Sequence, residues 1–148
     1  MAEKILYFGT QYAVEIHDWI IENSGGSAGI RDLGLLESPL QHIQNDLYYP
    51  AFHQKLTHLV FSVNKSHAFS DGNKRSSVAI GAYFLKINGY GFLVKKFVMK
   101  MEEISVLVAE GKISKDLLGE LIESLIFEED YNEALKLRYV IAVMGETM

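Results

Sequence analysis

Residues 67–77 read His67-Ala68-Phe69-Ser70-Asp71-Gly72-Asn73-Lys74-Arg75-Ser76-Ser77, and they precede an apolar run with helical spacing. A histidine, an aspartate, a Gly-Asn turn and two cations follow one another closely. Gly72 and Asn73 can adopt backbone angles that aim successive N–H groups at one point, and a helix that begins there adds the positive end of its dipole. The stretch therefore predicts a loop between two helices that binds phosphate-like anions.

The side chains of this stretch predict a separate chemical role for each residue. His67 carries the only side chain here whose ordinary pKa lies near neutrality, so it is the natural general base. Asp71 is a hard oxygen ligand, and Mg²⁺ bound to nucleotide phosphates takes only one or two protein carboxylates. Arg75 fits a phosphate bidentately, while Lys74 adds a compact charge. Phe69 is expected to turn inward and anchor the loop.

A plainer interpretation also fits the same residues. Asp-Gly-Asn is ordinary turn chemistry, and Lys-Arg at the start of a helix is often solvated surface. The chain contains three arginines, which are Arg31, Arg75 and Arg138. Because the chain has no general arginine-rich surface, the position of Arg75 favours a specific role.

The stretch resembles the His-x-Phe-x-Asp/Glu-Gly-Asn-Gly/Lys-Arg signature of the Fic/Doc superfamily at every specified position. The segment from Ser24 to Ser38 is similar to the region that precedes the active site in Doc-type, death-on-curing toxins. The segment from Phe84 to Tyr90 resembles the end of their motif helix. The similarity covers residues 4–126, and residues 127–148 are expected to add a C-terminal helix to a single domain spanning 1–148.

The resemblance implies a compact all-α domain with a small flap or hairpin near the active site. It implies a transferase that uses ATP with Mg²⁺ to modify a hydroxyl side chain of a target protein. His67 would match the catalytic histidine, Asp71 the metal-binding acid, Gly72 and Asn73 the anion cradle, and Arg75 the phosphate clamp.

Lys74 favours phosphate transfer over AMP transfer. Most members of the wider family carry Gly at this position and transfer AMP, whereas Doc-type members carry Lys and are associated with phosphate transfer to a translation elongation factor. The Lys74 charge attracts the terminal phosphates, and its bulk closes a backbone approach that Gly would leave open. Val78 stands where AMP-transferring relatives often carry another Arg, which favours the same side.

The segment from Ser38 to Tyr49 corresponds, by the resemblance, to a flap that holds the target chain over the active site. Its polar side chains could hydrogen-bond an extended peptide, and an ordinary surface loop is the alternative for each of them. The candidate residues are Gln41, Asn45, Tyr48 and Tyr49.

The chain lacks the inhibitory sequence motif found in many Fic-type enzymes, and this absence bears on how its activity is controlled. Many Fic-type enzymes are restrained by Ser/Thr-x-x-x-Glu-Gly/Asn, but Ser105 to Glu110 has one residue too many and Ser124 to Glu128 is followed by Glu129. We therefore expect control in trans by a small antitoxin. Besides a phosphotransferase toxin, the sequence leaves open an AMP transferase and a non-catalytic module that binds a peptide or nucleotide.

The composition bounds these alternatives. With 148 residues, 49% of them hydrophobic, the chain predicts one core, and the absence of cysteine excludes disulfides and thiolate zinc sites. A net charge of -5 argues against nucleic-acid binding. The start, Met1 to Lys4, leads into only a short apolar patch, and no run is long enough to cross a membrane. These features predict a soluble, cytoplasmic protein.

Helical periodicity recurs along the chain. We expect a buried central helix at 73–88, in which Gly81 permits the close approach of a neighbouring helix. The histidines outside the motif (His17, His42, His53, His58) have no partner at metal-ligand spacing, so structural or surface roles are expected. The other predicted helices span 10–23, 32–43 (interrupted at Pro39), 50–66, 97–110, 115–126 and 130–143.

Overall fold

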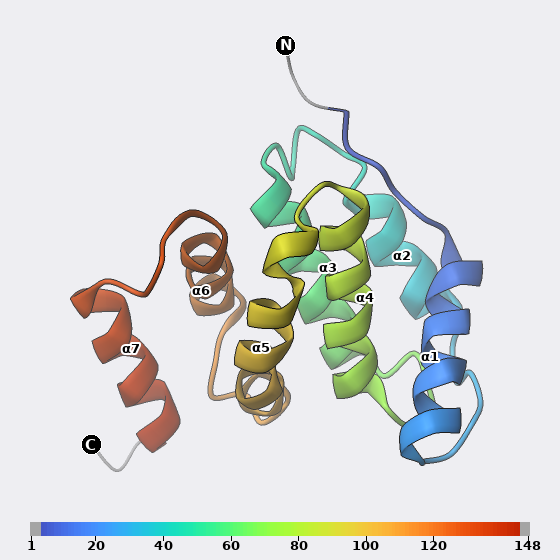
Figure 1. Ribbon diagram of the computed structural model, residues 1–148. Coiled ribbons are helices and arrows are strands. Elements are labelled where there is room, and N and C mark those ends of the chain that lie inside the picture. The colour runs from blue at the N-terminus through green and yellow to red at the C-terminus, as the bar shows by residue number, and fades with distance from the viewer. Residues whose placement is uncertain (1–3, 146–148) are drawn as a thin grey trace.

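The computed structural model describes residues 4–145, and this part of the chain is all-α (Figure 1). The described residues leave out 1–3 and 146–148. The first three residues of the start that is predicted to be non-secretory therefore lie outside the described residues. No strand occurs between residues 4 and 145, where the pairing of Ile30 with Phe69 is an isolated antiparallel bridge. The helices are α1 (Thr10–Ser24), α2 (Gly34–His42), α3 (Phe52–Ser66), α4 (Asn73–Ile87), the short 3-10 helix η1 (Gly91–Leu93), α5 (Val94–Ala109), α6 (Lys115–Phe127) and α7 (Glu133–Met144).

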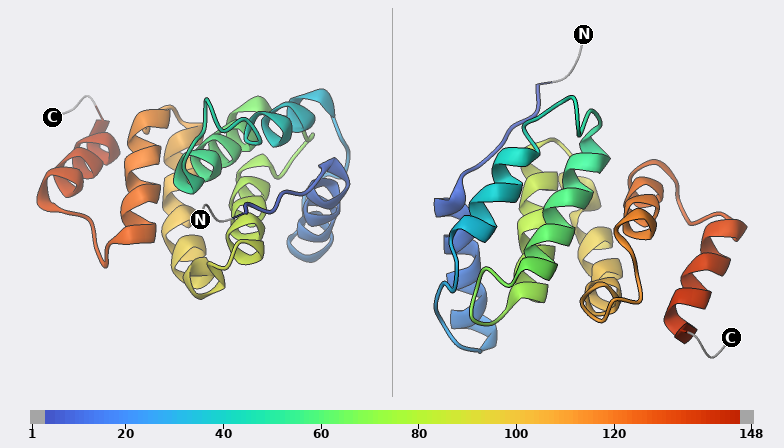
Figure 2. Two further views of the ribbon diagram at one scale, coloured as in Figure 1. Left: turned by 90° about the horizontal axis from the view of Figure 1, so that it is seen from above. Right: turned by 180° about the vertical axis from the view of Figure 1, so that it is seen from behind.

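Helix α4 forms the centre of the fold, as its apolar sequence predicts. It lies between α3, α5 and α1, and Ile80, Phe84 and Leu85 on it are completely buried (Figures 1 and 2). A Cβ atom on Gly81 would lie 2.8 Å from Val60 Cγ2 on α3 and 3.0 Å from Phe97 Cζ on α5. The predicted close approach is confirmed, because any larger residue would force these packed side chains apart.

Helix α2 corrects one prediction. The helix runs without interruption through Pro39 and ends three residues later at His42. Pro39 cannot donate a backbone hydrogen bond to the preceding turn. Leu36, Pro39, Leu40 and Ile43 are nevertheless all buried, and α2 packs along α3. Packing of this face compensates for the missing hydrogen bond.

Helix α7 confirms the predicted C-terminal helix. Its Leu135 belongs to the hydrophobic core, Tyr139 packs against the core, and the Tyr139 hydroxyl donates to Glu103 Oε1 at 2.9 Å. Val140 and Val143 on the same helix remain exposed. None of the helices within residues 4–145 is long and apolar enough to cross a membrane.

The motif occupies the joint between two packed helices. Helix α3 ends at Ser66 and α4 begins at Asn73, so residues 67–72 form the connecting loop, as predicted. The C-terminal end of α1 and the segment that follows it lie at this same end of the bundle (Figure 1). The motif loop is thus held by the ends of three helices.

Candidate active site

The backbone of the motif loop is fixed by one asparagine and one aromatic residue. The Asn73 side chain accepts from Phe69 N at 3.1 Å through Oδ1 and donates to Phe69 O at 3.0 Å through Nδ2. The Phe69 ring is 1% exposed, which confirms that it turns into the core. The Asn73 side chain therefore closes the loop, and the Asn73 backbone N–H is free to bind an anion.

Helix α4 begins with unpaired donors. Gly72 precedes it in the left-handed conformation, with φ at 77°, and the helical bonds begin with Ser76 N, which donates to Gly72 O at 2.9 Å. Within residues 4–145, the backbone N–H groups of Asn73, Lys74 and Arg75 meet no acceptor. Three free N–H groups at the positive end of a 15-residue helix form a site that attracts anions.

Asp71 is exposed beside these donors, and its carboxylate has backbone partners. Its Oδ1 accepts from Gly72 N at 2.8 Å, and its Oδ2 accepts from Ser27 N at 3.0 Å. These bonds from Ser27 and Gly72, aided by the nearby Arg75 charge, hold the pKa of the Asp71 carboxyl below its ordinary value. The group is therefore ionised at neutral pH, which is the form that binds a cation.

The segment that borders the motif loop is the glycine-rich stretch after α1. Arg75 Nη1 donates to Ser24 Oγ at 2.6 Å and to Gly25 O at 2.9 Å. Gly26 allows this contact, because a Cβ there would lie 2.6 Å from Asp71 Oδ2 and 3.0 Å from Arg75 Nη2. Farther along, Ser70 N donates to Gly29 O at 3.1 Å. Sequence reasoning missed Ser24 and Ser27, although the run of glycines was a visible signal of close backbone approach.

His67 and Lys74 are exposed motif residues whose side chains make no hydrogen bond to the described residues. His67 follows the last residue of α3 and has a left-handed backbone, with φ at 55°; it is the only non-glycine residue between 4 and 145 with positive φ. Its ring makes no hydrogen bond to any described residue. A strained backbone at an exposed histidine is typical of functional sites, where surrounding structure compensates for the strain.

The four residues predicted to form a flap do not lie over the motif loop. Gln41 is near the end of α2, while Asn45, Tyr48 and Tyr49 precede the start of α3. The motif loop follows the other end of α3, which at 15 residues is about 22 Å long. This placement corrects the prediction of a flap over the active site, because the segment lies at the end of α3 that is away from the motif loop. Residues 24–32 border the loop instead.

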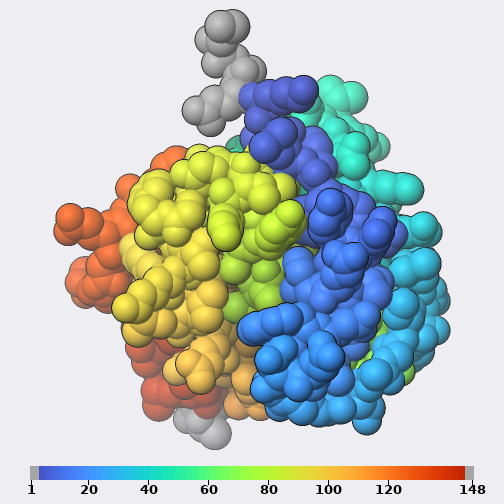
Figure 3. Space-filling view, turned by 45° about the vertical axis from the view of Figure 1, so that its right-hand side comes forward, coloured from blue at the N-terminus to red at the C-terminus, as the bar shows by residue number. Residues whose placement is uncertain are grey.

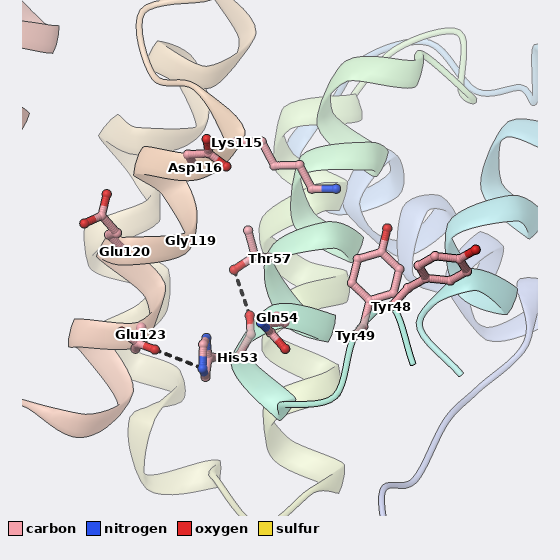
Figure 4. A pocket seen from close by; sticks show the side chains of 10 residues that line it. All are labelled: Tyr48, Tyr49, His53, Gln54, Thr57, Lys115, Asp116, Gly119, Glu120 and Glu123. Carbon is pink, nitrogen blue, oxygen red and sulfur yellow. Dashed lines mark hydrogen bonds and ion pairs between the residues drawn. The ribbon is translucent and has the colours of Figure 1, made fainter. Parts of the chain in front are cut away.

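Tyr48 and Tyr49 line a different cavity, of about 370 Å³, between α3 and α6 (Figure 4). At its edge, Lys115 Nζ donates to His58 Nδ1 at 2.7 Å, and the Tyr49 hydroxyl lies 3.1 Å from the same nitrogen. Across the cavity, His53 Nε2 lies 3.0 Å from Glu123 Oε2. These histidines have the structural roles that the sequence predicts.

The His58 environment predicts an acid-sensitive fold. Burial, followed by the charges of Lys115 and His42, lowers the pKa of His58 to about 4 from its ordinary 6.5. Below about pH 6.5 the unfolded chain binds a proton at His58, whereas the folded chain binds one only near pH 4. Lowering the pH through this range therefore favours the unfolded state. We expect the thermal midpoint to fall between pH 7 and pH 5, measured by circular dichroism. The thermal midpoint of the His58→Gln variant should fall less over the same pH range. An equal fall in both proteins would contradict this account.

A groove runs beside the motif between α1 and α5, with α4 at its floor (Figure 3). Near Arg75 it contains a cavity of about 390 Å³, and farther along a second of about 710 Å³. The first is bordered by Lys74, Arg75 and Ser24 together with apolar residues of the three helices. The second is bordered by Trp19, which is 65% exposed.

The donor set at the motif suits a magnesium–nucleotide complex better than a free metal ion. Among the described residues, no cluster of three or more His, Cys, Asp or Glu side chains could hold a metal by itself. One ionised carboxylate, Asp71, is enough for Mg²⁺ when phosphate oxygens and waters supply its other ligands, and the three free N–H groups beside it can bind those phosphates. The residues present therefore fit this cofactor.

Comparisons with known proteins agree with the motif. A model of the Fic/DOC family matches residues 7–85. Toxin Doc of Mycolicibacterium smegmatis is 39% identical over 69 residues, a match that covers 44% of this chain and 53% of the relative. Protein kinase doc of Escherichia phage P1 is 27% identical over 116 residues, covering 76% of this chain and 89% of the relative. This chain thus spans about half the length of the first relative and most of the second.

Proposed function

We propose that this chain, which belongs to the Fic/DOC family, is a Doc-like toxin of a toxin–antitoxin pair that phosphorylates a hydroxyl side chain of a target protein. The phosphate donor is ATP. The observation that carries the proposal is the convergence of the Asp71 carboxylate, the Arg75 guanidinium and the free N–H groups of α4 at one helix end. These groups have the chemistry of a polyphosphate site.

Each residue then has one task. The α4 N–H groups from Asn73 to Arg75 and the Arg75 side chain bind phosphate oxygens, while Asp71 would hold Mg²⁺. The bound Mg²⁺ would neutralise charge on the phosphates. Phosphate binding requires Arg75 to exchange its bonds to Ser24 and Gly25 for bonds to the nucleotide. Because those two partners lie on the exposed surface, the exchange costs little.

The transfer step uses His67 as the base. The hydroxyl oxygen of the target forms a bond to the terminal phosphorus of ATP, and the bond from that phosphorus to the oxygen of ADP breaks. ADP leaves with the electron pair, and His67 takes the hydroxyl proton. The exposed imidazole, free of hydrogen bonds to the described residues, is available for this proton.

Lys74 favours phosphate transfer over the alternative, AMP transfer. Its exposed ammonium stands next to Arg75 at the mouth of the groove, where it adds attraction for the terminal phosphates of the nucleotide. A glycine at this position would provide no charge to attract the terminal phosphates. The target that the resemblance suggests is a translation elongation factor.

The partner that restrains the toxin would be a small antitoxin acting in trans. The groove between α1 and α5 is the surface that we assign to it, since it adjoins Arg75 and exposes apolar side chains such as Trp19 and Val98. An antitoxin helix seated there would cover the phosphate end of the nucleotide site. Such coverage would stop transfer without any restraining segment within this chain.

One experiment tests the proposed reaction. Purified protein is incubated with Mg²⁺ and a bacterial lysate, with ATP labelled at the alpha phosphorus in one tube and at the gamma phosphorus in another. We expect protein to be labelled only in the gamma tube. Label from the alpha position would mean AMP transfer. Absence of label from both tubes, with nucleotide binding intact, would favour a binding module.

A further inference from the structure

A buried histidine lies directly beneath the motif loop. His17 projects from α1, and its side chain is 0% exposed. Its ring stacks on Phe69 with centroids 3.8 Å apart and planes 2° from parallel. Its Nε2 atom lies 2.7 Å from the backbone oxygen of Asp71. Because a carbonyl oxygen only accepts, Nε2 carries the hydrogen and donates it.

This bond controls the peptide at which the loop becomes a helix. The Asp71 carbonyl and the Gly72 N–H belong to one planar unit, so fixing the oxygen also fixes the direction of the N–H. That N–H donates to Asp71 Oδ1 at 2.8 Å and so orients the carboxylate. The same peptide leads into the left-handed Gly72 and the free donors of α4. One hydrogen bond therefore aligns both the carboxylate and the anion site.

The bond from Nε2 is the only hydrogen bond that the His17 imidazole makes to the described residues. His17 Nδ1 is buried and has no hydrogen-bond partner among the described residues, and its nearest charged neighbour is Asp18 Oδ1 at 3.6 Å. Buried polar atoms without partners are uncommon and destabilising. Leucine or phenylalanine would fill a core position without that cost. A histidine here is explained by what Nε2 does for the loop.

We propose that His17 is a positioning residue for the transfer reaction, because it holds the Asp71–Gly72 peptide so that the carboxylate and the α4 N–H groups converge on the nucleotide phosphates. The inference rests on the proposed function for its role in transfer. The role in holding the peptide can be measured without any transfer.

Two substitutions separate the hydrogen bond from packing. His17→Phe keeps an aromatic ring to stack on Phe69 but removes the donor, whereas the amide of His17→Gln can donate to the Asp71 oxygen. His53→Phe, which alters a half-buried histidine between α3 and α6, is the matched control. Groups that orient a metal ligand typically contribute about 10–100-fold to affinity or activity. We expect His17→Phe to weaken Mg²⁺-dependent ATP binding by about tenfold or more, and His17→Gln to recover much of it.

Amide hydrogen exchange gives a readout that does not depend on activity. In His17→Phe, the Gly72 N–H should exchange at least about tenfold faster, while amides within α4, such as that of Ile80, keep their protection. The proposal is overturned if Gly72 exchange and ATP binding are unchanged in His17→Phe. It is also overturned if His17→Phe and His17→Gln lose thermal stability and binding equally, because packing alone would then explain the residue. If the wild-type chain binds ATP but transfers no label, the proposed function fails while the exchange and binding results still decide the role of His17.

Discussion

Replacing His67 with Asn is expected to reduce phosphate transfer by about 10²–10⁴-fold while leaving ATP binding within about twofold of the wild type, because a general base contributes that much to rate. Asn is a better choice than Ala, since His67 has a left-handed backbone and Asn tolerates that conformation well. The exposed imidazole makes no hydrogen bond to the described residues, so its loss should not disturb the loop. Single-turnover labelling with gamma-labelled ATP measures the rate, and calorimetry measures binding.

The matched control for this variant is His42→Asn. His42 is also exposed, but it ends α2 at the far end of the bundle from the motif loop. The control should transfer phosphate at the wild-type rate. If His67→Asn retained a rate within about threefold of the wild type, a role as general base would be wrong. If neither the wild type nor His67→Asn transferred phosphate and both kept the same biological activity, the non-catalytic binding module would be favoured.

The sequence predicted the motif loop well because local chemistry determines it. Gly72 provides the positive φ, Phe69 provides the buried anchor, and the apolar spacing after Asn73 defines a central helix. Each of these effects acts within a few residues of its cause. The order of helices could be read for the same reason.

The neighbours of the loop could not be predicted, because they depend on which segments packing brings together. Ser27 lies 44 residues from Asp71, and His17 lies 54 residues from it, yet both donate to Asp71. No periodic pattern distinguishes His17 from a core histidine. The misplaced flap has the same origin: Tyr48 and Tyr49 precede α3, and only the length of α3 shows that they are far from the loop.

Asp71 tests whether the site is built for a metal–nucleotide complex. An alternative role is purely structural, since its carboxylate already accepts from Gly72 N and Ser27 N and could serve only to join the loop to the glycine-rich segment. The Asp71→Asn variant separates these roles. The amide oxygen can still accept one of the two backbone bonds, and water can satisfy the other at this exposed position, so the fold should keep nearly the wild-type thermal midpoint.

The expected loss in Asp71→Asn is specific to magnesium. A neutral amide oxygen is a poorer ligand for Mg²⁺ than an ionised carboxylate, so the gain in ATP affinity on adding Mg²⁺ should shrink by about tenfold or more. Affinity without Mg²⁺ should stay equal or rise, because a negative charge beside the phosphates is removed. Calorimetric titration with and without Mg²⁺ gives this ratio, with Asp116→Asn, at an exposed aspartate in the first turn of α6, as control. An unchanged ratio would mean that Asp71 only joins the loop to residues 24–27, and the metal would then have to bind through the phosphates alone.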